Sequence, residues 1–411
     1  MEKIETQVFN QINDLLNKHN QVKLLNYLNT LDSEERVNLI GHISKIDWSF
    51  LAPHKSYYSL EDISPINIMS TSEINSNKEK YAQTGIKALQ SGKLALVLLA
   101  GGQGTRLGYD HPKGMYDIGI NKSLYIFECL INNTMKIVRQ TGCFIPFYIM
   151  TSSINNEETI AFFKEHNYFG YNPEYITFFI QESNPVTDFE GNILLSDKSS
   201  ICISPNGNGG WFSSMGRNGL LDKLLASPVE WINVFSVDNV LQGIADPVFL
   251  GATIESGLTC GAKVVAKAAP DEKVGAICSM NGHPHIIEYY ELSDKMMNEK
   301  NPDGTYAYGH GVILNYLFPI KKLTRTLNSD MPLHIVKKAV PYMDYDGNFI
   351  TPDEVNAYKY ETLALDLIHA MDTCLAFEIE REKEFAPIKN KSGVDSIDTA
   401  RELLIKNGAE I

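Results

Sequence analysis

The sequence predicts an α/β protein built around a mixed, mainly parallel sheet. Two observations support this prediction: short apolar runs recur from Leu94 onward, and most of them are separated by segments of helix length. In a parallel sheet, the helices that connect the strands cover both faces of the sheet. Its strands are therefore buried on both sides and appear in the sequence as nearly continuous apolar runs. The runs are LALVLLA, FIPFYIMT, YITFFIQ, INVFSVDNV, AKVVAKA, VGAIC and HIIEYYEL.

The length of 411 residues exceeds what one ordinary core holds, so the chain is expected to fold as several domains. From about Thr324 the pattern changes to mixed helix and loop, which predicts a smaller domain at the C-terminus. The predicted domains are a helical N-terminal one over 1–85, an α/β core over 86–323 and a small α+β one over 324–411.

The N-terminal segment has the periodicity of helices. Apolar residues between Val8 and Leu31 fall near helical spacing, and the following TLDSEE predicts a cap for the next helix. The text from Leu51 to Asn77 is rich in Pro, Ser and Asn, which predicts a loop. A short helix over 78–91 is expected to lead from this loop into the first strand of the sheet.

Composition excludes several classes of function. The net charge of −14 is the opposite of what a general nucleic-acid binder needs. No apolar run approaches the roughly 20 residues of a membrane helix, and Met1–Thr30 lacks the shape of a signal peptide. The six cysteines and 10 histidines show no zinc-ligand spacing, so reduced, buried thiols are expected. We expect a cytoplasmic protein with neither nucleic acid nor membrane as partner.

A glycine-rich loop follows the first strand of the predicted sheet, in LALVLLAGGQGTRLGYDHPKGMYDI. Gly101, Gly102 and Gly104 let a ligand approach main-chain N–H groups without meeting a Cβ. Such a loop alone is often only a tight turn, but Arg106 and Lys113 follow closely and favour phosphate binding. The spacing matches neither the GxxxxGK[ST] phosphate loop nor the GxGxxG dinucleotide fingerprint.

Asp238 supplies the acidic group that phosphoryl or nucleotidyl transfer needs beside backbone donors and cations. It ends the apolar run INVFSVDNVL, where a carboxylate is costly unless it meets a cation or firm hydrogen bonds. It is therefore a predicted Mg²⁺ ligand, and the alternative is a cap for the following turn. A second glycine loop, SPNGNGGWFSSM, is either a wall over a polar ligand such as a sugar or a plain surface turn.

In combination these segments resemble the eukaryotic UDP-N-acetylglucosamine pyrophosphorylases. The matching segments are LLAGGQGTRLG, PKGMYDIG, YIMTS, PNGNGG, SVDNVL, CGAKVV, IIEYYEL and FAPIKN. The resemblance implies a Rossmann-like nucleotidyltransferase core that joins UTP and N-acetylglucosamine 1-phosphate, giving UDP-N-acetylglucosamine and pyrophosphate. It implies Mg²⁺ as the cofactor, with Mn²⁺ as an alternative, and we expect a monomer or a weak homo-oligomer.

The resemblance also assigns roles at the nucleotide. It implies that the backbone of Gly101 and Gly102 lies against the uridine and that Gln181 reads the uracil. It implies that Arg106 and Lys113 steady the triphosphate and the charge that develops at the α-phosphorus.

The remaining roles concern the metal, the sugar and the outer phosphates. The resemblance makes Asp238 the Mg²⁺ ligand, places Gly207 and Asn208 near the uridine and the sugar, and lets Glu288 accept from sugar hydroxyls. It also brings Lys389 of FAPIKN over the phosphates. Because Lys389 is expected on a different domain from the glycine loop, we expect domain closure on substrate binding.

The sequence departs from the family where the N-acetyl group is held. The family's NAGN segment reads YGHGVILN here, which puts Gly309 and Val312 at the two asparagine positions, and an aromatic-bearing segment downstream reads LALDLI. Losing an amide that bonds the acetamido group removes part of the selection for it. The alternatives are the same chemistry on glucose, galactose or N-acetylgalactosamine 1-phosphate, a regulator that binds nucleotide sugars without catalysis, and a Mg²⁺-dependent glycosyltransferase.

Overall fold

The computed structural model describes residues 2–51, 62–327 and 331–411, and the chain divides into two compact units. The small unit is built from Met1–Ser56, Glu182–Gly210 and Pro332–Leu363, and the large unit from Tyr57–Gln181, Trp211–Met331 and Ala364–Ile411. Each unit joins segments that are far apart in the sequence. This division differs from the three consecutive domains expected over 1–85, 86–323 and 324–411.

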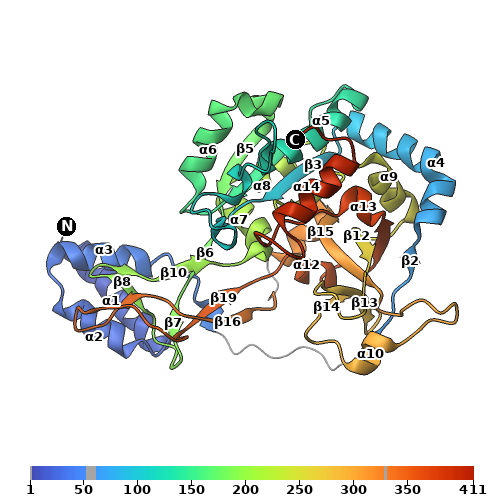
Figure 1. Cartoon of the computed structure of the whole chain (residues 1–411). Helices are drawn as coiled ribbons and strands as arrows, with labels where there is room; N and C mark the ends of the chain where they lie inside the picture. The colour runs from blue at the N-terminus through green and yellow to red at the C-terminus, as the bar shows by residue number, and fades with distance from the viewer. Residues whose placement is uncertain (1, 52–61, 328–330) are drawn as a thin grey trace. The chain divides into compact units, whose positions relative to one another are not determined.

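One mixed sheet organises the large unit (Figure 1). Its main path runs in the order β2, β20, β12, β15, β11, β3, β4, β5, while β13, β14 and β1 are attached at the side. The neighbours β11, β3, β4 and β5 are parallel, as are β12 and β20, and β15 runs antiparallel to both β11 and β12. The predicted α/β class with a mixed, mainly parallel sheet is confirmed.

All seven apolar runs contain strands of this sheet. They are β3 (Leu94–Leu99), β4 (Phe147–Thr151), β5 (Ile176–Ile180), β11 (Trp231–Ser236), β12 (Cys260–Ala266), β13 (Ala276–Met280) and β14 (His283–Ile287). The other strands are β1 (Ile63–Ser64), β2 (Ile68–Met69), β15 (His310–Pro319) and β20 (Cys374–Ile379). Every residue of β3 is buried, as expected of a strand that is covered on both faces.

The C-terminal part of the chain does not form a domain of its own. β20 lies between β2 and β12 in the large sheet, because its apolar residues are buried there. Residues 332–363 belong instead to the small unit. Where mixed helix and loop was expected, they form β16 (His334–Lys338), β17 (Tyr342–Met343), β18 (Phe349–Ile350) and β19 (Ala357–Glu361).

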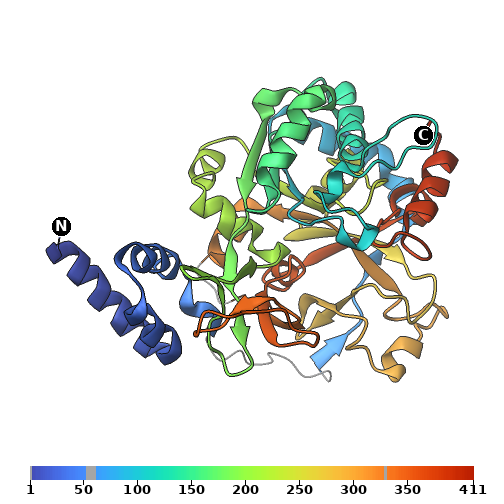
Figure 2. The same cartoon turned by 60° about the vertical axis from the view of Figure 1, so that its left-hand side comes forward.

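The small unit combines helices with short strands. The predicted N-terminal helices are present as α1 (Glu2–Lys18), α2 (Val22–Thr30) and α3 (Ser33–Ile43), in blue in Figures 1 and 2. The predicted cap is Asp32, whose carboxylate accepts from the N–H groups of Glu34 and Glu35 at 2.9 Å. The helices share a core with residues of β8 (Leu195–Asp197), β9 (Ser200–Ile201) and β17.

Helices cover the large sheet, and two of them approach each other closely. α4 (Thr71–Gln90) and α9 (Pro247–Ser256) pack side by side (Figure 1). α4 is longer than the helix predicted over 78–91, because the Ser70 side chain accepts from the Glu73 N–H and starts the helix earlier. The loop expected from Leu51 therefore ends before Thr71, and its residues 52–61 lie outside the described part of the chain.

Two further sequence predictions concern membrane-spanning helices and cysteine thiols. None of the helices in the described chain combines the length and the apolar character needed to cross a membrane. All six cysteine thiols are free, and all but the half-buried Cys143 are buried, in agreement with the expectation from their spacing.

The contact between α4 and α9 depends on glycine. A Cβ on Gly85 would lie 1.9 Å from the carbonyl oxygen of Pro247, so Gly85→Ala forces the two helices apart. We expect the free energy of unfolding to fall by about 1–3 kcal/mol, which is the usual cost of overpacking. Urea unfolding followed by circular dichroism measures the change.

Gly41→Ala is the matched control, because Gly41 lies within α3 and an added Cβ meets nothing within 4 Å. The better helix propensity of alanine should leave stability unchanged or raise it by up to about 1 kcal/mol. Equal effects of the two substitutions would contradict a close backbone contact between α4 and α9.

Candidate functional site

The predicted site residues of the large unit gather where the parallel strands end. The glycine loop follows β3, Gln181 follows β5 and Asp238 follows β11. The register places Leu99 of β3 beside Met150 of β4 and Ser236 of β11, so these strands end at one edge of the sheet. In open α/β sheets this edge is where ligands bind.

The glycine loop is held by backbone hydrogen bonds, while three of its amide groups have no acceptor in the described chain. Gly104 N–H donates to the His111 carbonyl at 2.9 Å, and Lys113 N–H donates to the Gly102 carbonyl at 3.2 Å. The buried Asn155 amide donates to the Ala100 carbonyl at 3.0 Å and fixes the start of the loop. Within the described ranges, the N–H groups from Gly101 to Gln103 have no acceptor. Adjacent free amides can donate to an anionic ligand.

Gln181 lies directly against this loop. Its backbone N–H donates to the Thr151 carbonyl at 2.8 Å, and its side chain is only 7% exposed. A Cβ on Gly101 would lie 2.2 Å from Gln181 Oε1, whereas a Cβ on Gly102 would meet nothing within 4 Å. The structure thus brings Gly101 and Gln181 together and leaves the space over Gly102 open. A primary amide offers both donors and an acceptor to a flat polar ligand.

An ion pair joins the loop to the end of β11. Lys113 Nζ contacts Asp238 Oδ1; Lys113 is 11% exposed and Asp238 is 37% exposed. Lys113 begins a 3₁₀ turn in which a Cβ on Gly114 would lie 2.2 Å from the Phe127 ring, so the turn packs tightly on α5 (Ile126–Thr141). Asp238 meets a cation, as its place on an apolar strand requires.

The alternative role predicted for Asp238 was to cap the following turn, but the neighbouring Asn239 caps this turn instead. Asn239 Oδ1 accepts from the Leu241 N–H at 3.3 Å and from the Ala386 N–H at 2.9 Å. The Asp238 carboxylate receives no backbone N–H within the described chain. The partly exposed carboxylate, which is paired with Lys113 through Oδ1, can therefore still reach a ligand.

Arg106 and Lys389 differ in how they are held. Arg106 lies exposed in the 3₁₀ turn Thr105–Leu107, and its guanidinium has no hydrogen-bond or ion-pair partner among the described residues. Lys389 Nζ pairs with Asp395 Oδ2 at 3.0 Å. The Ile388 N–H donates to the Asp238 carbonyl at 2.9 Å, so Lys389 follows a residue that is bonded to the site.

The expected reason for domain closure is wrong. Lys389 belongs to the same compact unit as the glycine loop, since β20 pairs within the large sheet and the chain after it is bonded to the Asp238 turn. No movement between domains is needed to bring Lys389 to this edge of the sheet.

Glu288 and the two departures from the family lie around β15. Glu288 is half-buried after β14, and its N–H donates to Glu291 Oε2 at 3.0 Å. Burial, followed by the negative charge of Glu288, raises the pKa of Tyr316 on β15 well above its usual value. Val312, also on β15, packs against apolar core residues. A Cβ on Gly309 would lie 2.9 Å from the Tyr306 carbonyl, so no asparagine fits there without a shift of the backbone.

Gly207 and Asn208 belong to the small unit. Gly207 has a φ of +85°, and a Cβ there would lie 2.2 Å from the Thr362 carbonyl. The Gly209 N–H donates to the same carbonyl at 2.9 Å, and Gly209 and Gly210 are buried. The second glycine loop is therefore bound to residues 361–363 and is more than a plain surface turn.

The protein offers one carboxylate, not a cage, to a metal ion. No group of three or more His, Cys, Asp or Glu side chains in the described chain is arranged to hold a metal. Mg²⁺ needs only one or two carboxylates when phosphates and water complete its shell. The half-exposed Asp238 at the ligand-binding edge fits that requirement.

Sequence reasoning missed a buried ion cluster behind the site. Lys263 on β12 is 0% exposed and pairs with Asp246 and Glu384. The signal was present, since Lys263 interrupts the apolar run AKVVAKA of a strand expected to be buried.

Comparison with known proteins places these features in a family. The family described as UTP–glucose-1-phosphate uridylyltransferase matches residues 42–405 of the chain. The chain belongs to this family. The predicted resemblance to UDP-N-acetylglucosamine pyrophosphorylases is confirmed by similar proteins that carry this name.

A UDP-N-acetylglucosamine pyrophosphorylase from Saccharomyces cerevisiae is 35% identical over 410 residues, covering 96% of this chain and 86% of the yeast protein. A UDP-N-acetylhexosamine pyrophosphorylase-like protein 1 from Mus musculus is 38% identical over 325 residues, covering 77% of this chain. The match spans 64% of the length of that mouse protein.

A solved structure shows the same fold. The uridine diphosphate N-acetylglucosamine pyrophosphorylase from Trypanosoma brucei, in complex with an inhibitor, superposes with a TM-score of 0.81 at 25% identity. The superposition covers 97% of this chain and 84% of the trypanosomal one. The predicted nucleotidyltransferase fold is confirmed.

Proposed function

We propose that the chain is a uridylyltransferase that joins UTP and N-acetylglucosamine 1-phosphate, giving UDP-N-acetylglucosamine and pyrophosphate. One observation carries the proposal: the Gln181 amide lies against Gly101, beside free backbone amides and the Lys113–Asp238 pair. Such a site offers base recognition and charge stabilisation together. We also propose a cytoplasmic enzyme, monomeric or weakly homo-oligomeric, without nucleic acid or membrane as partner.

The reaction is an in-line displacement at the α-phosphorus of UTP. A phosphate oxygen of the sugar 1-phosphate forms the new bond to the α-phosphorus, and the bond to the bridging oxygen of pyrophosphate breaks. The attacking phosphate is already a nucleophile, so no general base is required. Most of the rate should come from positioning and from stabilising the charge on the phosphate oxygens.

The residues divide this work. Gln181 and the backbone of Gly101 and Gly102 would hold the uridine, because the amide and the open backbone face one another. Lys113 would meet charge developing at the α-phosphorus. Arg106, exposed and without a protein partner in the described chain, would bind the outer phosphates.

Lys389 would add a second ammonium from the segment that is bonded to Asp238. Asp238 would hold Mg²⁺, or Mn²⁺ in its place, and the ion would neutralise phosphate charge when bound.

The sugar side is proposed from the relatives and from β15. Glu288 would accept from sugar hydroxyls, and the roles of Gly207 and Asn208 near the uridine and the sugar rest on the resemblance alone. Neither Gly309 nor Val312 has a side-chain amide, so other groups must hold the acetamido substituent. We therefore expect weaker discrimination between N-acetylglucosamine and glucose 1-phosphate, which differ in the acetamido substituent, than an amide-lined pocket gives.

The proposed function is tested by supplying the purified chain with UTP, Mg²⁺ and one sugar 1-phosphate at a time. Pyrophosphate release should be fastest with N-acetylglucosamine 1-phosphate, and slower with glucose or galactose 1-phosphate. Comparable rates with glucose 1-phosphate would contradict the proposed substrate. Binding of UDP-sugar without any pyrophosphate release would indicate a regulator, and transfer of sugar to an acceptor would indicate a glycosyltransferase.

Lys113→Ala or Arg106→Ala should lower turnover by about 10²-fold or more, the scale of losing one preorganised charge-stabilising group. Steady-state pyrophosphate release measures the loss. Lys122→Ala is the matched control, because Lys122 is a nearby lysine that makes only an exposed pair with Glu410, 3.4 Å away. Near-normal turnover in both site variants would remove Lys113 and Arg106 from the mechanism.

The contact between Gly101 and Gln181 predicts a dependence between two substitutions. Gly101→Ala pushes its Cβ into Gln181 Oε1, so UTP affinity should fall by about tenfold, the equivalent of one lost hydrogen bond. Gln181→Ala should cost a similar amount. The double variant should lose little more than either alone, as calorimetric titration with UTP would show. Strictly additive losses would mean that the two residues act separately.

A further inference from the structure

The buried ion cluster of Lys263 lies directly behind the turn that carries Asp238. Lys263 Nζ contacts Glu384 Oε2 at 2.6 Å, Asp246 Oδ2 at 2.8 Å and the Gly243 carbonyl at 3.2 Å. Burial opposes the charge on Lys263, but the two carboxylates outweigh it and raise the pKa of the ammonium. Lys263 therefore stays charged at neutral pH although it is fully buried.

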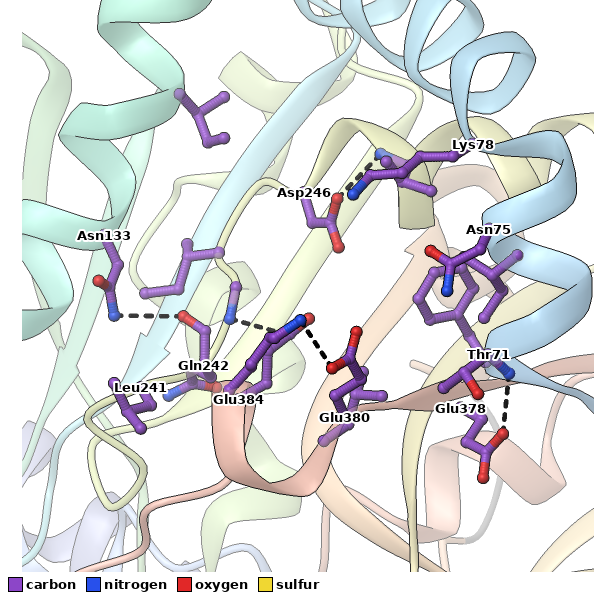
Figure 3. A pocket seen from close by; sticks show the side chains of 18 of the residues that line it. Thr71, Asn75, Lys78, Asn133, Leu241, Gln242, Asp246, Glu378, Glu380 and Glu384 are labelled. Carbon is purple, nitrogen blue, oxygen red and sulfur yellow. Dashed lines mark hydrogen bonds and ion pairs between the residues drawn. The ribbon is translucent and has the colours of Figure 1, made fainter. Parts of the chain in front are cut away.

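The three charges come from three different segments. Lys263 lies on β12, Asp246 caps α9 through the Val248 N–H at 2.9 Å, and Glu384 ends the short helix α13 (Arg381–Glu384). Asp246 and Glu384 also line a pocket of about 350 Å³ (Figure 3). A Cβ on Gly243 would lie 2.8 Å from both Lys263 Nζ and Glu384 Oε2, so glycine is what lets the turn approach the cluster.

Glu384 leads from the cluster to the proposed catalytic groups. Its carboxylate accepts from the Gly243 N–H at 2.9 Å, and its carbonyl accepts from the Asn239 amide at 2.7 Å. Asn239 in turn accepts from the Ala386 N–H at 2.9 Å. Directly beside these bonds, the Ile388 N–H donates to the Asp238 carbonyl at 2.9 Å. Residues 384–388 are thus joined to residues 238–243 by several hydrogen bonds, and Lys389 is the next residue in the chain.

β15 is irregular where it passes the cluster. The register of β12 and β15 shifts around Lys263, and Leu314 has a φ of 54°, in the left-handed region that a leucine rarely adopts. This irregularity lets Asn315 donate to the Gly243 carbonyl at 3.1 Å and to Gln242 Oε1 at 3.2 Å. The backbone of the turn is therefore held from β15 as well as from Lys263.

We propose that Lys263 is a positioning residue that, through Glu384, fixes the distance between Asp238 and Lys389. In this proposal the Lys263 ammonium does not contact the substrate. It holds residues 384–389 against the sheet, and the hydrogen bonds of this segment to Asn239 and Asp238 then fix where Asp238 lies. This inference rests on the proposed function, because the spacing of Asp238 and Lys389 matters only if both serve the phosphates. Small errors of position are costly in such reactions.

Two substitutions that each remove one carboxylate charge separate positioning from general stability. Glu384→Gln and Asp246→Asn both leave Lys263 with one ionised partner, so both variants should fold. Only Glu384→Gln loosens the segment that carries Lys389. Amide hydrogen exchange of Ala386 and Ile388 should accelerate by about tenfold in Glu384→Gln and stay within about twofold in Asp246→Asn.

The variant with faster amide exchange should also have the lower kcat. Glu384→Gln should lower kcat by about tenfold with little change in KM for UTP, since uridine recognition by Gln181 is untouched. Lys406→Met, which breaks the exposed Lys406–Glu382 pair near the same segment, should leave exchange and kcat at the wild-type level. Lys263→Met, if it folds, should resemble Glu384→Gln.

Equal exchange at Ala386 and Ile388 in Glu384→Gln and Asp246→Asn would overturn the positioning role. So would accelerated exchange with unchanged kcat. Exchange is measured without substrate, so an inactive wild-type protein would refute the proposed function separately, while the exchange comparison would still decide whether Lys263 holds the segment.

Discussion

The ion pair between Lys113 and Asp238 is the contact on which the rest of the site depends. It joins the glycine loop after β3 to the turn after β11, and these two strands are parallel neighbours. Each partner is held from behind. Lys113 is fixed by its backbone bond to Gly102, and Asp238 is fixed by the Ile388 N–H. Because the pair is only partly buried, its charges can be redirected to a ligand without leaving an isolated buried ion.

Around this pair the protein separates recognition from charge stabilisation. Gln181 and the free amides from Gly101 to Gln103 follow β5 and β3, while Lys389 lies after β20 and the Lys263 cluster is centred on β12. In the first set, the space over Gly102 is open, since a Cβ there would meet nothing within 4 Å. In the second set, the Lys263 cluster is bonded within itself and to the backbone and so adds rigidity, while Lys389 is the member that would serve the phosphates.

Much of this arrangement is predictable from local sequence, because it depends on how strands end. Apolar runs identify buried strands, and a parallel sheet brings the residues that follow them to one edge. That logic, applied to the order of residues alone, places Gly101, Gln181 and Asp238 together. It also explains why the loop composition of SPNGNGG is less informative, since the role of that loop depends on the distant residues 361–363.

Other features could not be predicted because they depend on contacts between distant segments. Nothing near Cys374 indicates that β20 inserts between β2 and β12, so a separate C-terminal domain was expected, and with it a domain closure to bring Lys389 to the site. The same holds for Lys263, whose partners lie 17 and 121 positions away in the sequence. The start of α4 was missed for a local reason, since Ser70 caps the helix within text that otherwise has loop composition.

The central claim is that the edge of the sheet formed by Gly101, Gln181, Lys113 and Asp238 binds the nucleotide. A crystal structure of the chain with UDP-N-acetylglucosamine and Mg²⁺ tests it most directly. We expect the uracil against Gly101 within hydrogen-bond distance of the Gln181 amide, with the diphosphate directed toward Lys113 and Asp238. A nucleotide bound away from Gly101 and Gln181, with these residues unchanged, would contradict it.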